Sequence, residues 1–223
     1  MTRWLIEPMD LPVESLAGEP AVPHCRLRAD MLRERFCLPP EWRPEQSSDH
    51  FLLSADQKLR PAAVLLPLVL REQGLTMLLT RRTTQLTDHA GQISFPGGCV
   101  EALDNSPIDA ALREAEEEIG LARRHVEVLG TMPEWLTGTG YRITPVVALV
   151  HPPFLLLADV SEVAEMFEVP MTFLMNGMHH QRRSGELSGG AGRRHFYVMH
   201  YEHFFIWGAT AGMLRNLFHF LRA

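Results

Sequence analysis

Three glutamates on a predicted helix constrain this chain more than any other feature. Glu114, Glu117 and Glu118 are spaced i, i+3, i+4, so an α-helix places their carboxylates on one face. Like charges at this spacing repel one another and destabilise the helix. A hard divalent cation removes that repulsion, because Mg²⁺ prefers carboxylate oxygens and usually shares its shell with water and phosphates. The spacing therefore indicates either a solvated acidic surface or a metal site.

The neighbouring residues give this helix a beginning, an end and a buried side. Ser106 is a favourable N-cap, Pro107 suits the first helical position, and Gly120 is typical just after a helix end. Apolar residues recur at helical spacing: Ile108, Ala111, Leu112, Ala115 and Ile119. Arg113 precedes Glu117 by four residues and can orient its carboxylate. Most charge runs are solvated surfaces, but solvation alone does not call for this arrangement.

Short apolar runs predict strands around the acidic helix. Residues 62–71 (AAVLLPLVLR) read as a buried strand, in which Pro67 indicates a bulge or a sheet edge. Further strands are predicted at 75–82, 92–95, 126–130 and 143–150, in part of 158–175 before a short helix, and in 194–206 as two strands or one bent strand. The Gly-rich residues 184–192 predict a mobile hairpin loop.

The two ends of the chain differ in regularity. Residues 207–221 predict a helix with Ala211, Leu214, Phe218 and Leu221 facing inward. Residues 1–24 read as an irregular arm, and 25–60 as a helix plus a linker. The helix, over 25–36, places Leu27, Met31, Leu32 and Phe36 on one side. We therefore divide the chain into an N-terminal arm, helix and linker (1–60) and an α/β layered domain (61–223).

The acidic helix resembles part of a known family motif. Gly98 followed by residues 113–121 (REAEEEIGL) is similar to the Nudix box, G-x5-E-x7-R-E-U-x-E-E-x-G-U, where U is aliphatic. The second half of the box matches at every specified position. In the first half, Asp104 replaces a glutamate, and one extra residue separates it from Arg113. The resemblance implies the Nudix fold, an α/β/α sandwich around a mixed β-sheet.

Two further segments resemble one branch of that family. Residues 78–98 (LLTRRTTQLTDHAGQISFPGG) are similar to the motif that precedes the box in the coenzyme A pyrophosphatases, although Thr87-Asp88 stand where a basic residue is common. Residues 203–217 (HFFIWGATAGMLRNL) resemble the closing segment of the branch. The resemblance implies hydrolysis of the pyrophosphate bond of coenzyme A and acyl-CoA with Mg²⁺ or Mn²⁺. The products would be 3′,5′-ADP and 4′-phosphopantetheine or its acyl form.

The same resemblance implies roles for residues of the box. Glu114 and Glu118 would be metal ligands, and Glu117 either a further ligand or a base. Gly98 would offer a backbone carbonyl to the metal, although a Gly-Gly pair can simply mark a tight turn. We predict Glu117 and Arg113 as catalytic residues, with the general base open among Glu101, Glu117, Glu162 and Glu165.

The sequence constrains the residues that bind the substrate less than it constrains the metal ligands. The candidates are Arg81, Arg82, His89 and Arg142, because guanidinium groups suit phosphates, yet each can equally be structural. Other Nudix substrates, such as ADP-ribose, dinucleotides and nucleoside triphosphates, remain an alternative. So does a Nudix-fold binding module without catalysis, which the three retained glutamates disfavour. The histidines lack zinc-ligand spacing, and no P-loop or nucleophile elbow occurs.

Composition narrows the partners and the compartment. A net charge of −6 argues against general binding of nucleic acid. Three cysteines without metal or redox spacing favour a reduced, cytoplasmic compartment. The longest apolar run, AAVLLPLVL, is too short to span a bilayer. We expect a small-molecule substrate, no membrane or nucleic-acid partner, and, from family habit, a homodimer.

Overall fold

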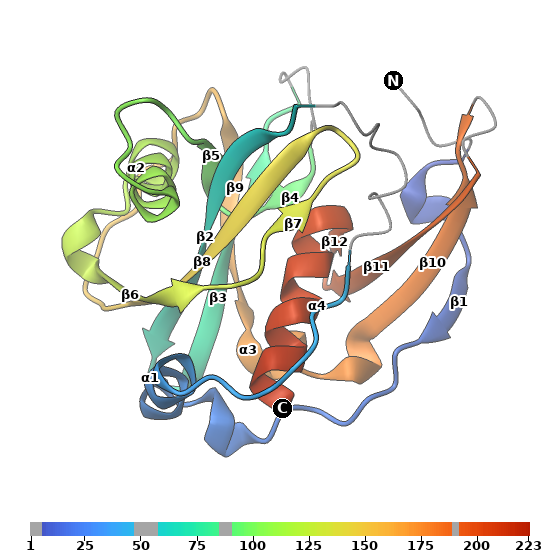
Figure 1. Ribbon diagram of the computed structural model, residues 1–223, viewed down its shortest axis with the longest axis horizontal. Coiled ribbons are helices and arrows are strands. Elements are labelled where there is room, and N and C mark those ends of the chain that lie inside the picture. Colours follow the sequence, from blue (N-terminus) through green and yellow to red (C-terminus); the bar gives the residue numbers. More distant parts are fainter. Residues whose placement is uncertain (1–5, 47–57, 85–90, 189–191) are drawn as a thin grey trace.

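A computed structural model describes residues 6–46, 58–84, 91–188 and 192–223 (Figure 1). The helices are α1 (Ala29–Cys37), α2 (Pro107–Ile119), α3 (Met171–Leu174) and α4 (Gly208–Arg222), with 3₁₀ turns η1 (Pro8–Asp10), η2 (His24–Leu27), η4 (Arg123–His125) and η5 (Gly177–His179). The strands are β1 (Val13–Leu16), β2 (Arg60–Arg71), β3 (Gly74–Arg82), β4 (Ile93–Ser94), β5 (Gly97–Cys99), β6 (Val126–Thr131), β7 (Trp135–Leu136), β8 (Tyr141–Val150), β9 (Val163–Pro170), β10 (His180–Glu186), β11 (Arg193–Tyr201) and β12 (Phe204–Trp207).

The main sheet is mixed and is built around strand β2. Its order is β4-β3-β2-β8-β6, and β5, β7 and β9 join by pairing with β2, β8 and β3. Strands β2 and β8 run parallel over the whole length of β8, whereas β2 and β3 form an antiparallel hairpin. Apolar side chains occupy both faces of β2, which is expected of a strand that is covered on both sides.

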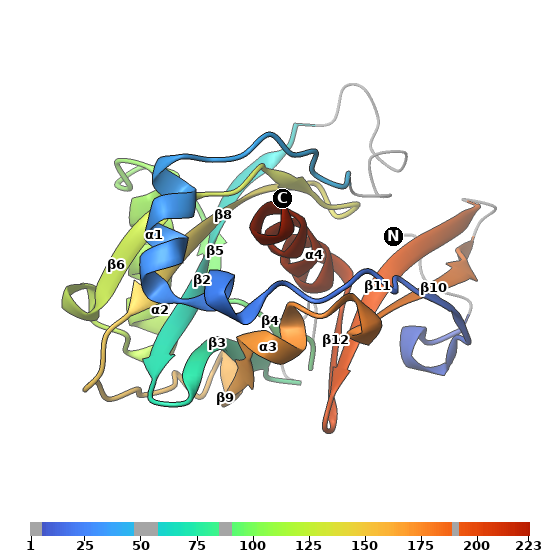
Figure 2. The same cartoon turned by 90° about the horizontal axis from the view of Figure 1, so that it is seen from below.

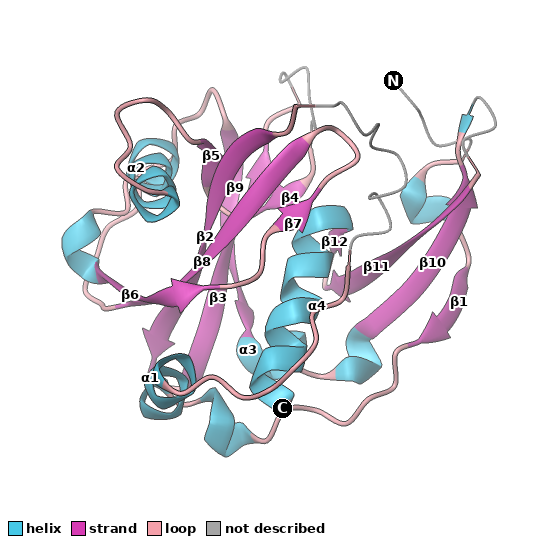
Figure 3. Cartoon of the chain, in the orientation of Figure 1, coloured by secondary structure: helices cyan, strands magenta, loops and turns pink. Residues whose placement is uncertain are grey.

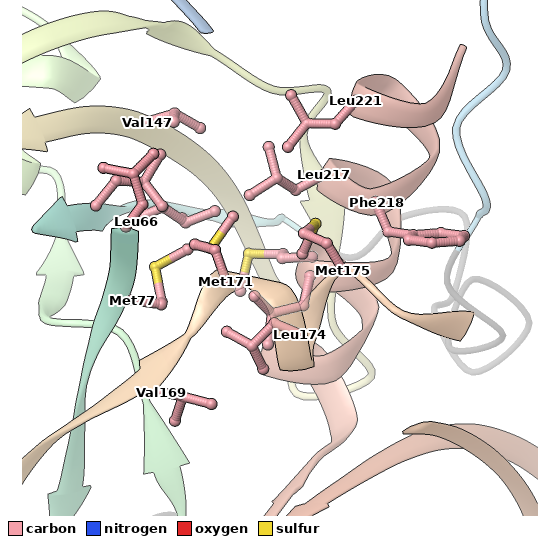
Figure 4. Close-up of a cluster of buried hydrophobic side chains, with 14 of the residues drawn as sticks. Leu66, Met77, Val147, Val169, Met171, Leu174, Met175, Leu217, Phe218 and Leu221 are labelled. Atoms are coloured by element: carbon pink, nitrogen blue, oxygen red, sulfur yellow. The ribbon is translucent and has the colours of Figure 1, made fainter. Parts of the chain in front are cut away.

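Helices cover both faces of this sheet and divide the core in two. On one face, Ala111, Ala115 and Ile119 of α2 pack with Leu65 and Val146. On the other face, α1 and α4 pack against a larger cluster (Figure 4). That cluster includes Leu32, Leu66, Met77, Val147, Leu174, Leu217, Phe218 and Leu221. The predicted α/β/α sandwich around a mixed sheet is confirmed.

A second, four-stranded sheet was not predicted from the sequence. Its order is β1-β10-β11-β12, and Figure 2 shows α4 between it and the main sheet. The prediction of an irregular arm over 1–24 is wrong at β1, whose residues pair with β10 from Gln181 to Arg183. All of β1 is exposed, so its sequence carries no alternation of apolar and polar residues. Pairing with a distant strand, rather than a local pattern, determines this element.

The prediction that Pro67 lies at a bulge or a sheet edge is wrong. Pro67 lies in the middle of β2, opposite Ala148 of β8. On the other side of β2, pairing passes from β5 at Ala62–Val64 to β3 at Leu68–Arg71. The N–H of Leu65 points to that side, toward the Pro96 carbonyl, so the missing N–H of Pro67 falls in the gap between two partners.

The remaining predictions of elements differ mainly in their limits. The N-terminal helix begins at Ala29 rather than residue 25, and Met31 is exposed while Leu32 is buried. Residues 194–206 form two strands, β11 and β12, and the inward-facing residues predicted for the last helix are buried in α4. Strands β10 and β11 form the predicted hairpin, although residues 189–191 lie outside the described part (Figure 3). No helix in the described ranges is long and apolar enough to cross a membrane.

Candidate active site

Helix α2 has the ends that its sequence predicts. The Ser106 hydroxyl accepts a hydrogen bond from the Asp109 amide at 3.2 Å, and Gly120 adopts a left-handed φ of 68° just after the last turn. The buried stripe of α2 fixes the rotation of the helix on the main sheet. Helix α2 thereby lies next to β5 (Figure 1), and its acidic side meets Gly97 and Gly98 of that strand.

The two glycines of β5 form the surface against which the acidic side rests. The Gly97 amide donates to the Glu118 carboxylate at 3.1 Å. A Cβ at Gly98 would overlap the Glu114 carboxylate, and one at Gly97 would overlap the Ala63 carbonyl of β2. The Gly-Gly pair is therefore more than a turn, because only glycine lets the backbone approach these carboxylates so closely.

Glu118 is a buried carboxyl with little compensating charge. Its residue is only 5% exposed. Burial raises the pKa of Glu118 to about 8, and the charges of Glu114 and Glu162 act in the same direction. The nearest guanidinium, that of Arg82, lies 3.8 Å away. The Arg82 Nε is itself buried and has no hydrogen-bond partner within the described residues.

Arg113 is shared among three carboxylates. It donates to Glu114 at 3.0 Å, to Glu117 at 2.9 Å and to Asp104 at 3.0 Å and 3.1 Å. Asp104 also accepts from the Glu101 amide, and the hydrogen bonds from Arg113 hold the pKa of Asp104 below its usual range. Asp104, the residue at which the box departs from its usual form, thus anchors the loop before α2 to Arg113. Sequence reasoning had assigned it no role.

Glu114 and Glu117 lie in different surroundings although Arg113 contacts both. The Glu114 side chain is largely buried, and burial raises its pKa despite Arg113. The Glu117 side chain is 59% exposed. Among the described residues, no group of three His, Cys, Asp or Glu side chains could hold a metal ion as arranged. The structure therefore brings Glu114 and Glu118 against Gly97 and Gly98 of β5, whereas the Glu117 carboxylate remains toward solvent.

The donor set nevertheless fits a hard divalent cation. Burial raises the pKa of both Glu114 and Glu118, so their charged forms are disfavoured unless a cation lies beside them. Carboxylate oxygens and the backbone oxygens of the adjoining glycine strand are the ligands that such ions prefer. A cation at this position would favour the ionised form of both side chains. Of all residues predicted as metal ligands, Glu114 and Glu118 therefore have the surroundings that most favour a bound cation.

The four candidates for a general base are separated by their neighbours. Glu101 is exposed in the loop before α2, and Glu165 forms an ion pair with Arg81 at 2.8 Å. Glu117 is bound by Arg113. Glu162 is half-buried in the turn just before β9, and its charge contributes to the raised pKa values of Glu114 and Glu118. Its negative charge therefore acts on both members of the acidic pair.

The predicted substrate residues are only partly brought together. Successive residues of β3 face opposite sides, so Arg82 points to Glu118 while Arg81 pairs with Glu165. Arg142 forms an exposed ion pair with Glu134 at 3.6 Å. His89 lies outside the described residues.

Comparison with known proteins identifies the family. Residues 59–168 match the NUDIX domain. The chain is 42% identical over 159 residues to "Uncharacterized Nudix hydrolase NudL" of Escherichia fergusonii, covering 71% of this chain and 81% of that protein. It is 41% identical over 181 residues to the NudL protein of Salmonella heidelberg, covering 76% and 92%. The chain therefore belongs to the Nudix hydrolase family.

Solved structures give a similar but weaker match. The crystal structure of RenU, a Nudix hydrolase from M. smegmatis, is 24% identical with a TM-score of 0.44 and covers 58% of this chain and 79% of that one. The family assignment defines the protein as an enzyme, a Nudix pyrophosphohydrolase. Nudix hydrolases act on small molecules and generally need divalent metal ions.

Proposed function

We propose that this enzyme hydrolyses the pyrophosphate bond of coenzyme A and acyl-CoA to 3′,5′-ADP and (acyl-)4′-phosphopantetheine. The observation that carries the proposal is the similarity of residues 78–98 to the motif of the coenzyme A pyrophosphatases. That segment ends in Gly97 and Gly98, which contact Glu118 and Glu114. The part of the sequence that indicates the substrate thus adjoins the carboxylates that indicate the reaction.

The proposed cofactor is Mg²⁺ or Mn²⁺, held by Glu114 and Glu118 with Glu117 and the Gly98 carbonyl as further candidates. Such an ion would neutralise phosphate charge and lower the pKa of water. Arg113 would keep Glu114 and Glu117 oriented through the hydrogen bonds it already donates. Arg82, which lies beside Glu118, would bind a phosphate oxygen of the substrate.

We propose Glu162 as the general base. Its charge acts on the acidic pair, and within the described residues it forms no ion pair such as that of Glu117 with Arg113 or of Glu165 with Arg81. Its backbone is fixed, because its carbonyl accepts from the Thr83 amide at 2.9 Å and its amide donates to the Asp159 carbonyl. Its carboxylate would take the proton of the attacking water.

A substrate panel tests the proposal. Coenzyme A, acetyl-CoA, ADP-ribose, NADH and dNTPs would be compared by kcat/KM with Mg²⁺ and with Mn²⁺, and products would be identified by mass spectrometry. We expect coenzyme A or acetyl-CoA to rank first and to give 3′,5′-ADP. If ADP-ribose or a dinucleotide ranked first, the branch assignment would be wrong while the pyrophosphohydrolase class would stand. Binding without any product would instead indicate a non-catalytic module.

Three further proposals concern the setting of the enzyme. We propose residues 61–223 as the hydrolase domain and 1–60 as its arm, helix and linker. We propose the cytoplasm as its compartment, because Cys25, Cys37 and Cys99 are all free thiols. We also propose a homodimer, which sedimentation velocity would distinguish from a monomer.

A further inference from the structure

A second pocket lies between α4 and the second sheet, apart from the acidic helix. Its volume is about 300 Å³, which is the lower end of the range for small-molecule sites. It is lined by residues of β10, β11 and the first turn of α4, by Trp135 of β7, and by Glu45. None of its lining residues belongs to the group formed by Gly97, Gly98, Glu114, Glu118 and Glu162.

Most of this pocket lies outside the segment that matches the NUDIX domain. Only Trp135 among its lining residues falls within 59–168, the segment that matches the NUDIX domain. The other walls come from the second sheet, from α4 and from the segment before residue 47. The pocket is therefore formed mainly by elements that lie outside residues 59–168.

Trp135, Phe196 and Tyr197 line the pocket, and the rings of Trp135 and Tyr197 are held in place as flat walls. A Cβ at Gly212 would overlap the Trp135 ring, so this ring rests directly on the backbone of α4 and is fixed there. Tyr197 is held by Arg215, whose guanidinium lies 4.6 Å from the centre of the phenol ring. Rigid aromatic walls suit a planar ring, which can stack on them at little entropic cost.

The charged side chains of the pocket are predominantly cationic. Arg182 and Arg194 line it, and Arg182 is exposed. Among the described residues, the one lining carboxylate is that of Glu45, which accepts hydrogen bonds from Arg215 at 2.7 Å and from His219 at 2.8 Å. On a chain with a net charge of −6, this collects positive charge where the overall balance opposes it. The combination selects an anion.

Small residues leave room for the anionic group. Gly208, at the beginning of α4, faces open space, since a Cβ there would meet nothing within 4 Å. Ala209 follows it and also lines the pocket. A phosphate at this position would lie near the N-terminal end of a 15-residue helix as well as near the arginines.

We propose that this pocket binds a mononucleotide, with its base against Trp135 and Tyr197 and its phosphate near Arg182 and Arg194. The proposal combines a cavity, fixed aromatic walls and a local excess of guanidinium groups. It defines a site separate from the hydrolytic centre. It does not depend on which pyrophosphate the enzyme cleaves.

Isothermal titration with AMP, adenosine and inorganic phosphate tests the proposal, using the full chain in EDTA so that no hydrolysis occurs. We expect AMP to bind saturably and at least about tenfold more tightly than adenosine or phosphate, because each of these lacks one of the two recognised parts. Binding of phosphate as tight as that of AMP would overturn the role of the aromatic walls. Absence of saturable AMP binding would overturn the site.

Two variants locate the binding in this pocket. Arg182→Glu reverses an exposed charge of the pocket, and Arg182→Gln only removes it. Both should weaken AMP binding, the first at least about tenfold, while the melting temperature stays unchanged. Arg124→Glu, an exposed charge reversal on η4, and Arg82→Gln, beside Glu118, are the controls and should retain binding. Loss of binding in Arg82→Gln but not in Arg182→Glu would place AMP in the hydrolytic centre and overturn the proposal.

Discussion

Two arginines of this enzyme each gather several acidic side chains, and they do so with opposite results. Arg215 of α4 is 2% exposed and binds Glu19 and Glu45, while its Nη1 also lies 3.1 Å from the His180 ring. Arg113 of α2 is 21% exposed and binds Asp104, Glu114 and Glu117. Around Arg215, the pKa of Glu19 falls to about 2, mainly because of its hydrogen bonds to the guanidinium. Beside Arg113, the pKa of Glu114 is raised.

Burial is the largest cause of the raised pKa of Glu114, and the number of charges that each arginine must balance adds to the difference. Arg215 and His219 share two carboxylates, and this group ties Glu19 and Glu45, from the N-terminal part of the chain, to α4. Arg113 serves three carboxylates, and its strongest hydrogen bonding is to Asp104. Glu118 and Glu162 add further negative charge beside Glu114. A balanced cluster stabilises a fold, whereas an unbalanced one is suited to bind a cation.

The sharpest test of this contrast is Glu118→Gln. Its amide oxygen can still accept from the Gly97 amide, so the fold should persist, but the negative charge is lost. We expect kcat/KM to fall at least about 100-fold, since charge stabilisation by a bound metal is worth several kcal/mol. Initial rates and a thermal melt would be measured together, with the exposed neighbour Glu116→Gln as the control. Near-normal turnover in Glu118→Gln would refute the metal assignment.

Matched replacement of the two arginines should separate stability from activity. Arg215→Met leaves two carboxylates facing an apolar side chain, so we expect a loss of about 3–5 kcal/mol in the free energy of unfolding. Arg113→Met should cost about half of that, because Glu117 can turn to water, but it should lower kcat/KM about tenfold or more. Urea unfolding and initial rates would be measured for both. Equal losses of stability would show that the two clusters do not differ as argued.

Acidification should lower the free energy of unfolding through the groups around Arg215, namely Glu19 and His180. The folded pKa of Glu19 is lowered from 4.5 to about 2, so its contribution is complete above pH 4.5 and is lost as the pH falls toward 2. Burial lowers the pKa of His180 to about 4, so stability is also lost between pH 6.5 and 4. We expect Glu19→Gln to be less stable than wild type by about 1–3 kcal/mol at pH 7 and by less at pH 3. Urea unfolding at both pH values checks this, and a constant difference would contradict it.

The clusters around Arg113 and Arg215 also differ in how much of each can be predicted from the sequence. The acidic face of α2 is a local pattern: the cap, the stripe and the glutamate spacing all lie within one helix, and they predicted its limits. Arg215 lies in α4, whereas its partners Glu19 and Glu45 both come from the N-terminal part of the chain, far away in sequence. No local spacing marks such a cluster.

The same limit explains what was missed elsewhere. Strand β1 is specified by its partner β10, and Pro67 is tolerated because of a gap between two other strands. In the sequence, Asp104 is a departure from the box without an assigned role. Its contact with Arg113 depends on the fold of the loop before α2, so no local pattern predicts it. Sequence spacing predicted the residues of the acidic pair, whereas the proposal of Glu162 as the base depends on the tertiary structure, which brings the turn before β9 near α2.

The smallest expected effects concern the arginines near the cluster. Arg81 and Arg82 are neighbours on β3 but face opposite sides, and only Arg82 lies beside Glu118. Arg82→Gln should lower kcat/KM about tenfold, because a guanidinium beside the reacting phosphates is lost. Arg81→Gln and Arg142→Gln, which break exposed ion pairs, should change it less than about threefold. A larger loss for Arg81→Gln would place the substrate on the Glu165 side of β3, away from the unbalanced carboxylates of α2.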